Sequence, residues 1–167
     1  MVREPGEHAG ADADAAITAT PGCTIAVRTA DCAPIVLVGQ RAVGVVHAGW
    51  KGLAAGVVRE AVTAMRRLDA GPVEARLGPC IRPGCYEFDG PELVTLTSQL
   101  GAAVATTTTW GTPAFDLPGA VISELGAAGV ERIIDEAGCT ACDRRFYSHR
   151  ARGELERFAT VAWIPSP

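Results

Sequence analysis

The sequence predicts an α/β or α+β sandwich in which a mixed β-sheet is flanked by helices. Short apolar, β-branched runs alternate irregularly with segments of helical periodicity, and Gly and Pro residues punctuate the boundaries between them. The 167 residues are 48% hydrophobic and 20% charged, which is typical of a globular chain with a real core. Since no repeat or linker interrupts the pattern, we expect residues 1–167 to form a single domain.

The first half of the chain supplies most of the predicted sheet. A polar loop over 1–14 leads directly into the first ordered segment, and a turn follows at Pro21-Gly22. The expected strands are 17–20, 23–29, 34–38, 42–47 and 73–77. Segment 34–38 also suits a short helix. Segment 42–47 is apolar on both faces, which favours a central position in the sheet.

Three helices are expected. The first spans 52–68, where the apolar residues recur at helical spacing: Leu53, Val57, Val58, Ala61, Val62 and Met65. The others span 91–100 and 117–128, and Gly129 stops the last one. A rigid loop rich in Gly, Pro and Cys covers 78–85. Segment 106–110 is β-prone, and strands are expected at 130–135 and 158–164.

Composition excludes several classes of function. The net charge is −4, and no basic tract is interleaved with aromatic residues, so nucleic acid is not expected as a partner. No apolar run reaches the roughly 18 residues that a membrane-spanning helix needs. Nothing at the start is similar to a signal peptide, so we expect a cytoplasmic protein whose six cysteines are reduced.

Cys32 and His47 are the most informative pair, because each lies at the end of an apolar run. A thiolate and an imidazole at the ends of neighbouring strands can bind one soft metal ion, with zinc as the first choice. A buried thiol beside a core histidine explains the spacing alone about equally well. Trp50 could wall a pocket beside the pair, and Asp31 could either orient a ligand or cap the turn.

Two further motifs carry weaker signals. Cys139 and Cys142 form a C-x2-C, but Cys80 and Cys85 do not supply the second such pair that a zinc ribbon needs, so we expect incidental cysteines in a loop. In the segment 146–150, Arg150 could hold phosphate and Ser148 could donate beside it. Composition alone favours a solvated turn there.

These pieces resemble one family in their order along the chain. It is the multicopper polyphenol oxidase, or laccase-domain, family, also known as peptidoglycan editing factor or purine nucleoside phosphorylase. The match covers almost the whole chain and rests on these segments: Ala13-Asp14-Ala15-Ala16-Ile17-Thr18, Thr29-Ala30-Asp31-Cys32-Ala33-Pro34, His47-Ala48-Gly49-Trp50-Lys51-Gly52, Leu77-Gly78-Pro79-Cys80-Ile81, Cys85-Tyr86-Glu87, Phe115-Asp116-Leu117, Cys139-Thr140 and Phe146-Tyr147-Ser148-His149-Arg150.

The resemblance implies a zinc-dependent enzyme that phosphorolyses adenosine, inosine and methylthioadenosine and deaminates adenosine. It implies a fold similar to that of bacterial deamidating toxins, with Cys32 and His47 as metal ligands. We expect Cys32, His47 and Arg150 to be catalytic. The expected substrate-binding residues are Asp31, Trp50, Ser148 and His149. Purine nucleosides and phosphate are the expected partners.

The chain departs from the family pattern in two places. The family's third metal ligand is a histidine in an upstream Gln-Val-His-Gly motif, which this sequence lacks, so we expect a domain truncated at its N-terminus and impaired in activity. The family has paired arginines where Arg150 is followed here by Ala151 and Arg152. Edges exposed by missing strands would favour a homo-oligomer. Two alternatives stay open: a copper-dependent polyphenol oxidase, and a non-catalytic fragment or paralogue that binds a ligand or partner.

Overall fold

A five-stranded mixed sheet forms the centre of the molecule. The computed structural model describes residues 1–4, 6–8, 10–69 and 71–166. The strand order is β1-β4-β3-β5-β8, with these bounds: β1 (Ala15–Thr18), β4 (Val43–Ala48), β3 (Ala33–Val38), β5 (Glu74–Leu77) and β8 (Arg132–Asp135). The β5–β8 pair is parallel and the other pairs are antiparallel, so the predicted mixed sheet is confirmed.

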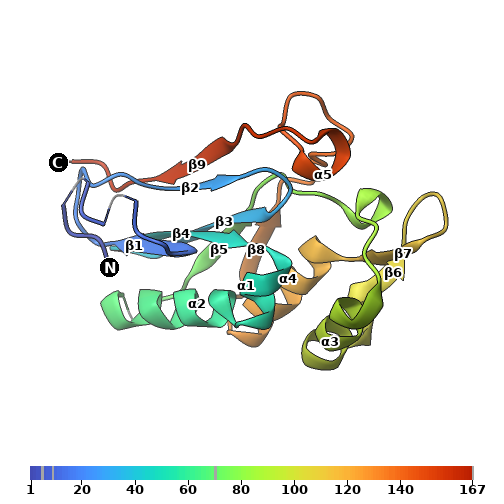
Figure 1. The fold of residues 1–167 in the computed structure, drawn as a ribbon. Coiled ribbons are helices and arrows are strands. Elements are labelled where there is room, and N and C mark those ends of the chain that lie inside the picture. Colours follow the sequence, from blue (N-terminus) through green and yellow to red (C-terminus); the bar gives the residue numbers. More distant parts are fainter. Residues whose placement is uncertain (5, 9, 70, 167) are drawn as a thin grey trace.

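Helices cover one face of this sheet (Figure 1). These are α1 (Trp50–Ala54), α2 (Val57–Leu68) and α4 (Leu117–Ala127), whereas α3 (Gly90–Leu100) packs against α1 and α4 beside the sheet. The main core lies between sheet and helices, where Ile35, Leu37 and Leu77 meet Met65 and Leu125, all essentially inaccessible to water. Burial of this apolar surface is the main stabilising term.

A two-stranded ribbon covers the opposite face. It pairs β2 (Ile25–Thr29) with β9 (Phe158–Ala162) in antiparallel register, which brings the two halves of the chain together. Buried and exposed residues alternate along β2, since one side of the ribbon packs on the sheet and the other meets solvent. Cys23, Ile25 and Val27 form a second, smaller core with Val45 and Ala162.

Smaller elements complete the chain. They are η1 (Pro83–Cys85), η2 (Ala102–Val104), a hairpin of β6 (Ala105–Thr107) with β7 (Pro113–Phe115), and the single-turn helix α5 (His149–Arg152). Sequence patterns predicted neither β7 nor α5, because both are too short to show a period. Among the described residues, no helix is both long enough and apolar enough to cross a membrane.

The helix expected over 52–68 is wrong as a single element. It begins earlier, at Trp50, and divides into α1 and α2 at Gly56, whose φ of +81° is left-handed. The Gly56 amide donates to the carbonyl of Leu53, which closes α1 before α2 begins. The apolar spacing hid this break, because both helices bury the same side against the sheet. Segment 34–38 is strand rather than helix.

The β3–β4 register positions the ends of the two strands that carry the predicted metal ligands. Pro34 lies opposite His47, and Ala33 lies opposite Ala48. Cys32, directly before β3, is therefore held beside the end of β4. Since both strands are interior, each is fixed by hydrogen bonds on two sides.

We expect Gly56→Ala to destabilise the fold by about 1 kcal/mol, because alanine is strained in the left-handed conformation. Gly126→Ala is the matched control: it lies within α4, no atom is within 4 Å of its added Cβ, and it should stabilise by about 0.5 to 1 kcal/mol. Urea unfolding measures both. Equal effects of the two substitutions would contradict the assigned break.

Candidate functional site

Cys32 and His47 converge at the end of the sheet, as expected. The sulfur of Cys32 and Nε2 of His47 lie 3.0 and 3.9 Å from the position that a Cβ on Gly49 would occupy. Gly49 therefore leaves the space in which the two side chains meet. A larger residue there would press on the sulfur, since the shorter distance is below ordinary contact.

His47 is oriented from its other side by Asp14. Nδ1 of the ring lies 2.7 Å from Oδ1 of Asp14, and the His47 amide donates to the Asp14 carbonyl. The hydrogen bond with Cys32 is the main cause that raises the pKa of His47 to about 9; burial opposes it, and Asp14 adds to it. A carboxylate on one ring nitrogen fixes which nitrogen is presented to a ligand.

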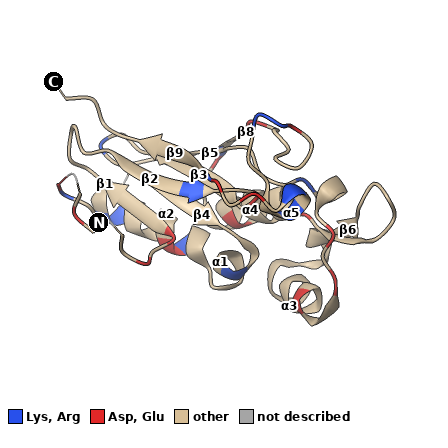
Figure 2. Ribbon diagram, turned by 45° about the horizontal axis from the view of Figure 1, so that its top comes forward, with Lys and Arg blue, Asp and Glu red and all other residues tan. Residues whose placement is uncertain are grey.

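A cleft of about 640 Å³ opens over this pair. Three arginines line it, from three segments: Arg28 of β2, Arg150 of α5 and Arg157 before β9. Basic segments on β2 and α5 are visible in Figure 2. His149 also lines the cleft. The arginine charges favour an anionic ligand.

Aromatic side chains line the cleft beside the basic groups. Trp50 at the start of α1 packs edge-on against Phe88, with ring centroids 5.6 Å apart. Tyr86 is buried, which raises its pKa to about 12, so its hydroxyl stays protonated. The Arg150 guanidinium lies 5.3 Å from the Tyr86 ring centroid, a cation–π contact that holds its charge at the cleft.

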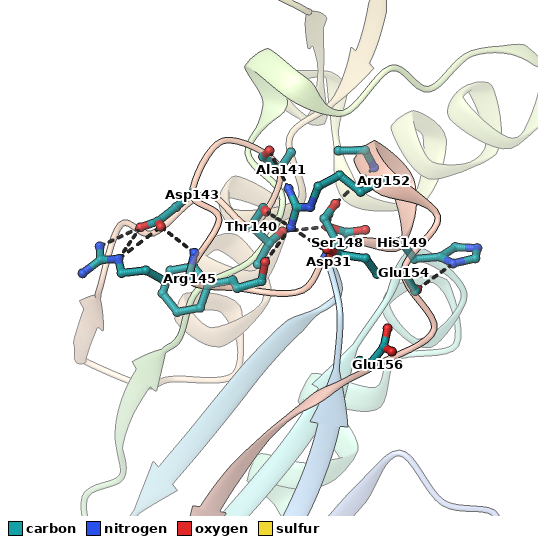
Figure 3. Close-up of polar contacts among 12 residues, drawn as sticks. Asp31, Thr140, Ala141, Asp143, Arg145, Ser148, His149, Arg152, Glu154 and Glu156 are labelled. Carbon is teal, nitrogen blue, oxygen red and sulfur yellow. Dashed lines mark hydrogen bonds and ion pairs between the residues drawn. The ribbon is translucent and has the colours of Figure 1, made fainter.

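Asp31 lines the cleft but is itself buried, and its side chain lies among polar partners (Figure 3). Its Oδ1 accepts hydrogen bonds from the hydroxyls of Thr140 and Ser148, both at 2.7 Å, and its Oδ2 accepts one from the Arg150 amide, also at 2.7 Å. The backbone of Asp31 is left-handed, with φ of +85°. These three hydrogen bonds satisfy the carboxylate and fix the 140–150 segment against Asp31.

Ser148 and Arg152 are also engaged within this segment. The Ser148 hydroxyl donates to Asp31, accepts from the Ala151 amide and so caps α5; it does not line the cleft. The Arg152 guanidinium donates to the carbonyls of Thr140, Ala141 and Phe146 and pairs with Glu154 at 3.0 Å (Figure 3). Arg152 therefore cannot act as a second anion-binding arginine in the cleft in this arrangement.

A separate thiol cluster joins two distant loops. The sulfurs of Cys85, Cys139 and Cys142 lie within 4.8 Å of one another, and those of Cys85 and Cys142 are 3.0 Å apart. All six cysteines of the chain are free thiols. We expected the C-x2-C to be incidental because no second pair exists; the structure instead brings one further cysteine to it, which spacing cannot reveal.

The Cys32–His47 pair and the thiol cluster differ in the number of metal ligands that they offer. Within the described part of the chain, no third His, Cys, Asp or Glu completes Cys32 and His47 to a triplet within 4.8 Å, whereas the thiol cluster is such a triplet. The donor types at Cys32 and His47 suit zinc, and Asp14 supplies the outer partner that metal-bound histidines have. These two residues fit as part of a metal site.

Sequence reasoning placed seven residues at one site. Six of them line the cleft, namely Cys32, His47, Asp31, Trp50, His149 and Arg150, and Ser148 does not. Sequence reasoning missed Arg28 and Arg157, since an arginine in a strand or loop has no distinguishing pattern. It also missed the partnership of Asp14 with His47. Asp14 and Tyr86 were both inside family motifs, which is the signal that could have singled them out.

Known proteins resemble this chain in sequence. It is 40% identical to a purine nucleoside phosphorylase of Streptomyces griseus over 167 aligned positions, covering 93% of this chain and 66% of that protein. It is 36% identical to a purine nucleoside phosphorylase of Mycobacterium tuberculosis, covering 98% and 67%. The chain thus spans about two thirds of the length of these relatives.

Solved structures share the fold. YlmD from Geobacillus stearothermophilus superposes with a TM-score of 0.82 at 32% identity, over 92% of this chain and 61% of its own. Neisseria meningitidis protein NMB0706 superposes with a TM-score of 0.85 at 30% identity, over 99% and 71%. Residues 1–165 match the family described as multi-copper polyphenol oxidoreductase laccase, and the chain therefore belongs to that family.

Proposed function

We propose that this chain carries the substrate site of a metal-dependent purine nucleoside phosphorylase. The observation that carries the proposal is the cleft, in which a thiol–imidazole pair, three arginines and two aromatic rings face one opening. The names of the relatives support the same activity. Since those relatives are longer, we propose further that residues 1–167 act as one domain within a longer active unit.

Phosphate is the ligand that the arginines fit best. Arg28, Arg150 and Arg157 approach from separate segments, so they can surround an anion rather than meet it from one side. In phosphorolysis a phosphate oxygen bonds to C1′ of the ribose while the bond from C1′ to the base breaks, and the bonding pair leaves with the base. Arginine charges would hold the phosphate against C1′ and offset its negative charge.

The nucleoside would lie toward the aromatic side of the cleft. Trp50 and Tyr86 offer flat apolar surfaces that suit a purine, and His149 offers a ring nitrogen at the rim. The position of Ser148 argues against direct substrate contact, because its single hydroxyl proton is donated to Asp31. We therefore assign Ser148 and Asp31 to positioning Arg150.

We propose zinc as the metal and Cys32 and His47 as two of its ligands, with the third supplied by residues beyond those that the structure describes. A bound zinc would supply a Lewis acid and a water of lowered pKa, which suits adenosine deamination. Asp14 would hold the His47 ring so that Nε2 faces the ion. The free thiols are compatible with a cytoplasmic setting, which we also propose.

Copper-dependent oxidation of phenols is the second candidate, and the family's description favours it. Thiolate and imidazole donors bind copper as well as zinc. Loading the metal-free protein with copper and following oxidation of a phenol separates the two: only this candidate requires copper and oxygen, and only the first requires phosphate.

Inosine phosphorolysis tests the proposal. The chain as given should release hypoxanthine slowly, and an extended chain that supplies the upstream histidine should release it faster, in both cases only with phosphate present. Cys32→Ala should lower turnover of the extended chain at least about 100-fold, because it removes a metal ligand. Cys23→Ala, in the second core away from the cleft, is the control. Undiminished turnover after Cys32→Ala would overturn the assignment.

Arg150→Ala should raise the KM for phosphate by about 10-fold or more, as expected for loss of one charge-assisted hydrogen bond. The backbone amide that binds Asp31 is retained in this variant, so the loop should stay in place. Arg145→Ala is the matched control, because Arg145 is exposed and pairs with Asp143 outside the cleft. Steady-state kinetics at varied phosphate measure both; equal KM values would contradict a phosphate role.

In the metal-free protein the imidazole of His47 should titrate with a pKa of about 9, and Cys32→Ala should return it toward 6.5. Because the folded-state pKa is raised, the stability that this pairing contributes is complete below about pH 6.5 and is lost as pH rises through about 9. NMR titration of the ring protons measures the pKa, with Cys142→Ser as control. An unchanged value in Cys32→Ala would show that the two side chains do not interact.

A further inference from the structure

A second soft-ligand cluster lies outside the cleft. Cys85 follows Pro83 and Gly84 in η1, whereas Cys139 and Cys142 lie in the loop after β8. None of these three cysteines lines the cleft described above. Their function is thus not accounted for by the proposed phosphorylase site.

We propose that Cys85, Cys139 and Cys142 form a separate thiolate site for one zinc ion, which fastens the 136–148 loop to the η1 loop. This goes beyond the proposed function and does not depend on it. Three sulfurs of the softest protein donor type meet at one point, and thiolates select zinc among the common divalent ions.

The spacing of the sulfurs suits a shared ion. With zinc–sulfur bonds of about 2.3 Å, tetrahedral coordination separates two sulfurs by about 3.8 Å. The three sulfurs lie within 4.8 Å of one another, and the closest pair, at 3.0 Å, would need to separate by less than about 1 Å. That pair is well beyond the roughly 2.05 Å of a disulfide. Cys142 is exposed, so water can fill the fourth position.

The backbone around Cys139 is arranged for a thiolate. Burial raises the pKa of Cys139, but hydrogen bonding from the Arg82 backbone, from the backbone and thiol of Cys142 and from the Ala141 backbone brings that pKa below its ordinary value.

Hydrogen bonds beside the cluster already join the η1 loop to the 136–148 loop. Arg82 donates to the Gly138 carbonyl and pairs bidentately with Asp135, so η1 and the loop after β8 are prealigned. Thr140, one of the donors to Asp31, lies between Cys139 and Cys142. An ion at the cluster would therefore also hold the Asp31 network in place.

The thiols do not favour simultaneous ionisation without a cation. Hydrogen bonding with Cys142 is the first cause that raises the pKa of Cys85 to about 12, and burial and the neighbouring thiolates add to it. A divalent ion removes this repulsion, and each thiol that binds releases its proton to solvent.

The test uses the Cys32→Ala/His47→Ala variant, so that the proposed cleft metal cannot contribute. The purified, reduced protein is dialysed with zinc chloride and then against metal-free buffer, and its zinc is measured. We expect one zinc per chain, protection of Cys85, Cys139 and Cys142 from iodoacetamide by mass spectrometry, and an unfolding temperature at least about 5 °C higher than without zinc.

Cys142→Ser is added to this variant, and because Cys142 is exposed the fold should stay intact. This substitution should abolish both the retention of zinc and the protection of the remaining cysteines from iodoacetamide. Adding Cys23→Ser instead should leave both unchanged, because Cys23 lies in the second core. Zinc retained without Cys142, no zinc retained with all three cysteines present, or a loss of two hydrogens that locks Cys85 to Cys142 under reducing conditions would each overturn the proposal.

Discussion

The buried carboxylate of Asp31 is the interaction on which the site depends. It comes directly before Cys32 and accepts hydrogen bonds from residues more than a hundred positions later in the chain: Thr140, Ser148 and the Arg150 amide. A buried charge without partners is costly, so the Asp31 carboxylate depends on all three donors. Asp31 has a left-handed backbone, and both Asp31 and the next residue, Cys32, line the cleft. The buried hydrogen-bond network of Asp31 therefore directly precedes Cys32 in the chain.

The layered architecture explains why the cleft lies where it does. The β3–β4 register brings Cys32 and His47 to one edge of the central sheet, and the β2–β9 ribbon carries Arg28 and the segment with Arg157 to the same edge from the opposite layer. The helix layer contributes Trp50 at the start of α1. The thiol–imidazole pair, Arg28 and Trp50 thus come from three layers, which two cores hold together. A cleft between packed layers can be wide enough for a ligand without loosening either core.

Thiols lie at two places with different surroundings. Cys32 shares its space with an imidazole held by Asp14, and Gly49 leaves room beside it. Cys139 instead lies beside two other thiols, those of Cys85 and Cys142. The first arrangement leaves positions open toward a cleft, as reactive sites require, whereas the second uses its donors to join two loops. The loop from 136 to 148 contacts both, through Thr140 to Asp31 and through its cysteines to Cys85.

The sequence by itself determined the mixed sheet, most of the strands and helices, and the pairing of Cys32 with His47. These follow from local periodicity and from two recognisable motifs at strand ends. Only the tertiary structure decided the rest. The break at Gly56 is invisible to a periodicity that α1 and α2 share, and α5 and β7 are too short to show one. The roles of Asp31 and Ser148, and the meeting of Cys85 with Cys139 and Cys142, depend on contacts between residues 54 to 119 positions apart. Local sequence sets the conformation of a segment, but such contacts form only when packing of the whole chain brings distant segments together.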